Sequence, residues 1–243
     1  MLPEREKYFA PFREQYQRTR AQERWGADNE NYYRALPRVP RDDPHRAMWR
    51  IREKNFRRVI AWIGAATSLR VLDVGAGNGW LANQLAARGH RVAAVDLRDD
   101  ARDGLGARRN YFFAFECYQA EFERLPFAPA QFDLVIFNAS LHYAASLAET
   151  LQEASRILAP IGKILLVDSP FYSHSITQSP NRPNYFLTFD QLNRTARELN
   201  LNIEIIFADA EWHKRARRKI IARKLGREPA HFPIYTLQSP PVP

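Results

Sequence analysis

Short apolar runs alternate with helix-like segments from about residue 70 onward. The apolar runs that predict strands lie at 70–74, 91–96, 113–118, 132–137 and 163–167. They are rich in β-branched and apolar residues without strict polar alternation, which is typical of strands covered on both faces. The segments that predict helices between them lie at 80–88, 101–109 and 147–158. This order predicts βα units and a mostly parallel sheet.

The C-terminal part of the pattern adds one helix and two strands. Thr188 and Gln191 have the spacing of a capping box, which predicts a helix over 189–199. Ser146 and Glu149 have the same spacing at the start of the last of the earlier helices. Two late strands are predicted at 202–207 and 233–237. The pattern therefore predicts seven strands in all.

The first 65 residues follow a different pattern, in which aromatic residues are scattered among charges and prolines interrupt the chain at positions 37, 40 and 44. An apolar stripe at helical spacing then predicts a helix over 45–63. We therefore predict an N-terminal helical or lid segment, 1–65, followed by a main domain, 66–243. A proline-containing stretch, 170–187, is predicted to be a long loop, and such loops often form lids or binding sites.

Composition excludes several classes of protein. The chain has 243 residues, of which 45% are hydrophobic, enough to bury a sizeable core. Its single cysteine, Cys117, forms no internal disulfide, and the histidines lack metal-binding spacing, so we expect a reducing compartment and no metal. No stretch has the apolar length of a membrane span, and the first residues lack the apolar segment of a signal peptide. A soluble, cytoplasmic protein is expected.

The net charge of +9 is unevenly distributed along the chain. Residues 1–60 carry +6 and residues 211–227 carry +7, whereas the remainder carries −4. Segment 211–227 places its apolar residues on one side of a helical projection, which predicts a basic amphipathic helix between the last two strands. Such a helix can contact anionic lipid, a phosphate-bearing acceptor or RNA, and it can equally be a surface helix with solvated cations.

A glycine-rich turn joins the first predicted strand to the first predicted helix. Gly75, Gly77 and Gly79 allow a sharp turn and a close backbone approach to a ligand, and the N–H groups of a helix start attract polar groups. Trp80 stands where the dinucleotide fingerprint has its third glycine, which argues against NAD or FAD, and no P-loop sequence follows. Asp96, at the end of the next strand, is placed to accept hydrogen bonds from a ribose diol.

Over residues 71–167 the sequence resembles the class I S-adenosylmethionine-dependent methyltransferases. The motifs that carry the resemblance are the glycine turn at 73–79, the acid Asp96, and the blocks 121–127, 132–143 and 157–163. The resemblance implies a Rossmann-like, seven-stranded, mostly parallel α/β sheet with helices on both faces and an antiparallel last strand, extended by the N-terminal helical segment. It also implies S-adenosyl-L-methionine as the cofactor.

The resemblance also implies which residues contact the cofactor. They are Asp73, Gly75, Ala76, Gly77, Asn78, Gly79, Asp96, Leu97, Glu121, Phe122 and Asn138. Asp73 and the glycine turn would lie along the methionine part, and Asp96 would hold the ribose. The Glu121 carboxylate would face the adenine amino group, and the Phe122 N–H would face a ring nitrogen. Asn138 would lie near the reaction centre.

His142 is the candidate catalytic base, because it follows the fourth predicted strand and a histidine titrates near neutral pH. An equally weighted interpretation is that His142 only orients the cofactor or packs beneath a loop. Asp168 and Tyr172, just past the fifth predicted strand, are second-line candidates for contact with the acceptor.

The methyl acceptor is left open by the sequence. Residues 138–141 lack the proline pair that amino-methylating enzymes of nucleic acids usually have, and Cys117 falls inside a predicted strand. We therefore expect methyl transfer to an oxygen, nitrogen or carbon of a small-molecule or lipid- or nucleotide-linked acceptor. The alternative is an RNA methyltransferase in which the N-terminal segment and 211–227 form one basic track. A non-catalytic, cofactor-binding partner subunit is a third hypothesis.

Overall fold

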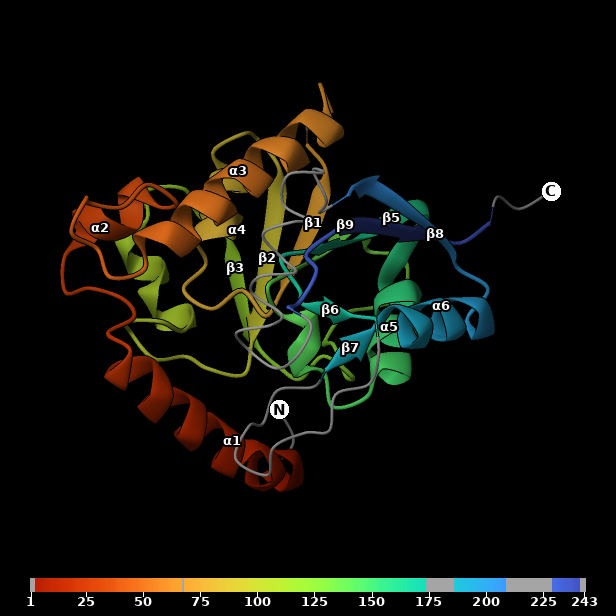
Figure 1. Ribbon diagram of the computed structural model, residues 1–243, viewed down its shortest axis with the longest axis horizontal. Coiled ribbons are helices and arrows are strands. Elements are labelled where there is room, and N and C mark those ends of the chain that lie inside the picture. The colour runs from red at the N-terminus through yellow and green to blue at the C-terminus, as the bar shows by residue number, and fades with distance from the viewer. Residues whose placement is uncertain (1–2, 67, 174–185, 209–228, 241–243) are drawn as a thin grey trace. The chain divides into compact units, whose positions relative to one another are not determined.

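The structure is a computed structural model that describes residues 3–66, 68–173, 186–208 and 229–240 (Figure 1). Its contacts divide the chain into two compact units, Met1–Pro126 and Phe127–Pro243. The predicted N-terminal segment, 1–65, belongs to the first of these units together with the first three strands. None of the helices in the described part of the chain has the length and apolarity needed to cross a membrane.

The first unit contains three parallel strands in the order β3-β2-β1. They are β1 (Arg70–Val74), β2 (Arg91–Asp96) and β3 (Glu116–Gln119). Helix α4 (Trp80–Ala86) connects β1 to β2 and is almost entirely buried. The first two strands have the predicted bounds, whereas β3 begins three residues later than predicted.

The helix predicted over 101–109 is wrong, because this segment forms turns followed by a short 3₁₀ helix, Leu105–Asn110. The Asp100 carboxylate accepts hydrogen bonds from the backbone N–H groups of Arg102 and Asp103 at 3.1 and 2.8 Å. Aspartate side chains that bind nearby backbone N–H groups in this way compete with helix formation. The apolar periodicity of the sequence does not reveal this local competition.

Three helices precede β1 in the first unit, drawn in red and orange in Figure 1: α1 (Pro3–Gln22), α2 (Glu30–Ala35) and α3 (Arg46–Ile63). Helix α3 has nearly its predicted bounds, and it buries Trp49 and Phe56. Both rings meet Trp80 edge to face, with ring centroids 5.8 Å apart in each case. The tryptophan that stands in place of a third glycine is therefore a packing residue that joins α3 to the start of α4.

Within the described residues, the second unit contributes four strands to the main sheet, in the order β4-β5-β9-β8. They are β4 (Phe132–Asn138), β5 (Leu158–Val167), β8 (Asn202–Phe207) and β9 (Ile234–Gln238). Strands β4 and β5 are parallel, whereas β9 is antiparallel to both β5 and β8. The predicted seven-stranded, mostly parallel sheet with an antiparallel last strand is confirmed for the described residues.

The α-helices in the described part of the second unit are α5 (Leu147–Ile157) and α6 (Phe189–Glu198). The predicted capping box at the start of α6 is confirmed, because Thr188 and Gln191 each accept a hydrogen bond from the other's backbone N–H. At the start of α5, the Ser146 hydroxyl accepts from the Glu149 N–H.

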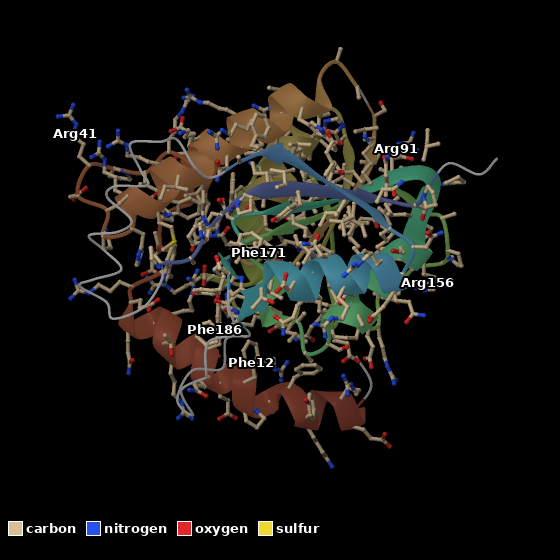
Figure 2. The ribbon with its side chains drawn as sticks, turned by 45° about the vertical axis from the view of Figure 1, so that its right-hand side comes forward. Phe12, Arg41, Arg91, Arg156, Phe171 and Phe186 are labelled. Carbon is tan, nitrogen blue, oxygen red and sulfur yellow. The ribbon has the colours of Figure 1, made fainter. Side chains whose placement is uncertain are left out.

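The two ends of the predicted long loop are paired in a short parallel sheet, β6 (Phe171–Tyr172) and β7 (Leu187–Thr188). Phe171, labelled in Figure 2, stacks on Phe189 with centroids 5.7 Å apart and packs against the Tyr235 ring at 5.2 Å. The rest of the loop, 174–185, and the predicted basic helix, 211–227, lie outside the described residues.

Candidate functional site

The glycine turn after β1 is held in a conformation that glycine adopts more readily than any other residue. Gly75, Gly77 and Gly79 have φ angles of 74°, 55° and 78°, all in the left-handed region. A Cβ atom at Gly79 would lie 2.6 Å from the Phe115 ring, whereas at Gly77 the nearest atom, the Asp103 carbonyl oxygen, would be 3.6 Å away. The turn is therefore closely packed at Gly79 and has room at Gly77.

Asp96, at the end of β2, has a carboxylate that two backbone N–H groups orient. The N–H of Gly77 donates to Oδ2 at 2.8 Å, and the N–H of Arg98 donates to Oδ1 at 2.9 Å. Burial raises the pKa of Asp96, while the Arg98 guanidinium and the two N–H groups act in the opposite direction. Each carboxylate oxygen keeps further acceptor capacity, which fits the hydroxyl groups of a ribose.

Asp73, in β1 directly before the glycine turn, is a buried carboxylate with 1% of its surface exposed. Neither of its oxygens makes a hydrogen bond of standard geometry with the described residues. Burial, reinforced by the charge of Asp96, raises the pKa of Asp73 to about 7, and the backbone N–H of Ala82 only partly offsets this. A buried, unsatisfied carboxylate is costly, so Asp73 fits the α-ammonium group of the cofactor's methionine part.

Asn78 is also buried, and its side chain stabilises the start of α4. The Asn78 Oδ1 accepts from the Trp80 N–H at 3.2 Å and lies 3.5 Å from the Tyr111 hydroxyl. Beside the turn, the N–H groups of Gly75 and Ala76 both donate to the Val95 carbonyl, at 2.7 and 3.0 Å. These bonds fix the backbone that the cofactor is expected to approach.

Glu121 and Phe122 follow β3 and are both buried. The Glu121 carboxylate forms an ion pair with Arg5 of α1, whose Nε lies 3.0 Å from Oε1 and 2.8 Å from Oε2. Arg5 itself lies over the rings of Tyr8 and Phe9, at 4.9 and 5.1 Å from their centroids. This partner of Glu121 could not be predicted from the sequence, because the two residues are 116 positions apart and no local pattern connects them.

Leu97, the remaining predicted contact of the first unit, is half-buried between Asp96 and Arg98. Its carbonyl oxygen accepts from the Gln119 side chain at 2.9 Å. The structure thus places the first unit's predicted contacts in three segments, which begin in the last residues of β1 and β2 and just after β3.

The second unit contains the predicted residues Asn138, His142 and Asp168 at the carboxyl ends of β4 and β5. Asn138 pairs in register with Val167, and the residues that follow this pair, Ala139 and Asp168, have φ angles of 55° and 53°. Left-handed backbone at a residue other than glycine is strained and clusters at functional sites. Both strands therefore end in sharp turns at the same edge of the sheet.

His142 lies in a short 3₁₀ turn, Leu141–Tyr143, that follows β4. It is buried, and its ring centroid is 4.1 Å from that of Tyr143. Tyr172, the other second-line candidate, is buried in β6, and Cys117 lies within β3 as expected. In the described part of the chain, no group of three or more His, Cys, Asp or Glu residues has the arrangement of a metal site.

Comparison with known proteins agrees with this geometry. Residues 72–166 match the model of a methyltransferase domain. A malonyl-[acyl-carrier protein] O-methyltransferase of Erwinia pyrifoliae is 37% identical over 109 residues, which cover 44% of this chain and 40% of that protein. The chain thus spans less than half the length of this curated relative.

Solved structures show the same fold at low sequence identity. Phosphoethanolamine N-methyltransferase 2 of Haemonchus contortus, in complex with S-adenosyl-L-methionine, has a TM-score of 0.57 at 17% identity, over 77% of this chain and 52% of that chain. The [4+2]-cyclase SpnF has a TM-score of 0.59 at 15% identity, over 78% of this chain and 82% of that chain. The second example shows that this fold is not tied to one reaction.

The family match shows that residues 72–166 carry a methyltransferase domain, and the sheet topology agrees with the fold of the solved methyltransferase structures. The Haemonchus contortus enzyme was solved with S-adenosyl-L-methionine bound on the same fold.

Proposed function

We propose that this protein transfers a methyl group from S-adenosylmethionine to a small-molecule acceptor. The observation that carries the proposal is the buried Asp73 carboxylate, which lacks a hydrogen-bond partner among the described residues, beside a glycine turn that leaves room at Gly77. A buried carboxylate of this kind fits a ligand that brings a positive charge. The oriented Asp96 carboxylate, one strand away, fits the hydroxyl groups of the same ligand.

The residues of the first unit have separate binding roles in this proposal. Asp73 holds the α-ammonium group, the backbone of Gly75–Gly79 follows the methionine part, and Asp96 accepts hydrogen bonds from the ribose. Glu121 and Phe122 line the adenine end, where the Glu121 carboxylate is shared with Arg5. A carboxylate accepts about four hydrogen bonds, so Arg5 and an adenine amino group can both be served.

The cofactor supplies an electrophilic methyl group on a sulfonium sulfur. The protein's part is to hold the acceptor in line with that group, because proximity and orientation lower the barrier of a two-reactant step. Asn138 is proposed to lie near the reaction centre. For a hydroxyl or carboxyl acceptor, His142 is proposed to accept the acceptor's proton, since histidine gains and loses protons near neutral pH.

The acceptor class is proposed from the charge distribution of the N-terminal segment. Many of its arginines are engaged in ion pairs: Arg5, Arg18, Arg20, Arg34, Arg38 and Arg57. Paired cations offer less to a nucleic-acid backbone than free ones, which favours a small-molecule acceptor over RNA. The O-methyltransferase activity named for the Erwinia pyrifoliae relative supports an oxygen as the atom methylated.

Titration calorimetry with S-adenosylhomocysteine tests the binding half of the proposal. We expect wild-type protein to bind and Asp96→Ala to bind about 100-fold more weakly, because two charge-assisted hydrogen bonds are lost. Asp99→Ala is the matched control, since Asp99 is an exposed aspartate three positions along the chain. Transfer of a labelled methyl group to a panel of small acceptors, with RNA as a parallel arm, tests the second half. The absence of binding by the wild type would overturn the proposal.

A further inference from the structure

In the first unit, three largely buried charged side chains form a row that connects to Asp96. Arg98, Asp103 and Arg20 have side chains that are 8%, 7% and 16% exposed. Asp103 Oδ2 lies 3.0 Å from an Arg98 guanidinium nitrogen and 2.5 Å from Arg20 Nε, and Oδ1 accepts from Arg20 at 3.1 Å. Burial alone would raise the pKa of Asp103, but the two guanidinium groups hold it below its usual value. Asp103 therefore stays ionised between two arginines.

This row of charges is connected directly to Asp96, the residue whose carboxylate is proposed to hold the ribose. The same Arg98 whose N–H donates to Asp96 Oδ1 folds its guanidinium onto the carbonyl oxygen and the carboxylate of Asp103. The Leu105 N–H in turn donates to the Arg98 carbonyl at 3.0 Å. Hydrogen bonds between its two ends thus hold the segment from 98 to 105 in a loop. The Arg98 N–H orients Asp96, and its position depends on the contact between Arg98 and Asp103.

Arg20 brings the N-terminal helix α1 into this arrangement. Its guanidinium carbon lies 3.7 Å from the centroid of the Trp25 ring, and Trp25 stacks on His45 at 3.7 Å with an interplanar angle of 7°. Arg20 is therefore held on one side by an aromatic stack and on the other by Asp103. Buried ion pairs cost desolvation energy and are weak stabilisers on balance, so stability alone is a poor reason for this one.

We propose that Arg98 is a positioning residue for Asp96, and that Arg20, acting through Asp103, makes helix α1 part of the cofactor-binding apparatus. The inference rests on the proposed role of Asp96 in binding the cofactor. Groups that orient a ligand-binding side chain typically change affinity by about 10-fold or more when removed, as they do around metal sites. We therefore expect cofactor affinity to depend on a residue of the N-terminal helix that lies 76 positions before Asp96 in the sequence.

The positive charge of Arg98 lets its positioning role be distinguished from packing, through the pH dependence of binding. The charged groups that face Asp96 are Arg98, Asp103 and Asp73, of which only Arg98 favours the ionised carboxylate. Removing the Arg98 charge should raise the pKa of Asp96 further, so that ribose binding by the ionised form is lost at a higher pH than in the wild type. A loss of packing alone would weaken binding equally at every pH.

Calorimetry with S-adenosylhomocysteine on full-length variants tests the inference. Arg20→Met keeps a stem of similar length over Trp25 and removes the charge, and we expect about 10-fold weaker binding. Arg20→Lys restores a charge and should recover part of the affinity. Arg18→Met is the matched control, because Arg18 is an exposed arginine of the same helix that pairs with Glu14, and it should bind within about twofold of wild type.

Arg98→Met is the second variant, measured between pH 6 and 8 alongside wild type. We expect its affinity to fall more steeply as the pH is lowered, and thermal unfolding will report whether it is folded. If it does not fold, the affinity of Arg20→Met relative to Arg18→Met decides the question. Wild-type affinity in Arg20→Met, or a uniform loss without a pH shift in Arg98→Met, would overturn the inference. Failure of the proposed function looks different, because then Asp96→Ala would bind as the wild type does.

Discussion

The two units of the molecule carry different kinds of candidate functional residue. In the first unit these are the carboxylates Asp73 and Asp96, buried or half-buried at the ends of neighbouring strands. In the second unit they are Asn138, which ends β4, and His142, which follows the left-handed turn at Ala139. The first set is suited to binding a cationic, hydroxyl-bearing ligand, and the second to positioning a reacting group. Binding and turnover should therefore be separable by mutation.

The largest effect that would sharpen this contrast is expected at His142. If His142 is the base, His142→Ala should lower turnover by about 100-fold or more, because general-base catalysis typically contributes that much. Its affinity for S-adenosylhomocysteine should stay within about twofold of wild type. Steady-state kinetics and calorimetry on the same preparation give both values. Unchanged turnover would assign His142 to packing.

Asp73→Asn should have a smaller effect, and it should weaken ligand binding while it stabilises the fold. Because burial raises the pKa of Asp73 from 3.8 to about 7, the folded protein holds a proton that the unfolded chain releases between these values. Wild-type stability should therefore fall as the pH rises from about 4 to 7 and remain lower above pH 7. Asp73→Asn should lose this fall and be about 1–3 kcal/mol more stable than wild type at pH 8, while binding about tenfold more weakly.

Urea unfolding at pH 5 and pH 8 measures the stability half of this prediction. The expected result is that the difference between Asp73→Asn and wild type is larger at pH 8 than at pH 5. An equal difference at both values would mean that burial does not raise the pKa of Asp73, and it would contradict the buried, unsatisfied carboxylate that sets the first unit apart.

The last two expected effects concern stability alone, and the smaller of them is at Gly77 in the glycine turn. Gly79→Ala meets both a left-handed φ of 78° and the Phe115 ring, so it should destabilise the fold by about 1–3 kcal/mol. Gly77→Ala meets only the Asp103 carbonyl oxygen, at a van der Waals distance of 3.6 Å, and at a φ of 55° it should cost about 1 kcal/mol. Thermal unfolding of the pair checks the order, and a larger cost at Gly77 would contradict the described packing.

Local patterns predicted the βα core well. The strands at 70–74, 91–96 and 202–207 have the bounds that their apolar runs indicated, and the capping box at Thr188 is present. Each of these features is specified by residues that lie close together in the sequence. The position of Asp96 at the end of β2 followed from the same local signals.

Long-range and side-chain effects were not predictable in this way. Helix α1 contains Pro11 and no clear apolar stripe, so periodicity gives no sign of it. Its contacts join Arg5 to Glu121 and Arg20 to Asp103, over separations of 116 and 83 residues. Ion pairs of this kind depend on the complete fold, and a single sequence gives no signal of which charges will meet.

The most direct test of the central claim compares two ligands on the two carboxylates. S-adenosylhomocysteine has both the adenosine and the amino-acid part, whereas 5′-methylthioadenosine lacks the amino-acid part. By calorimetry, Asp73→Asn should weaken binding of S-adenosylhomocysteine about tenfold and leave 5′-methylthioadenosine unchanged, while Asp96→Ala should weaken both ligands. Equal weakening of both ligands by Asp73→Asn, or of neither by Asp96→Ala, would contradict the account.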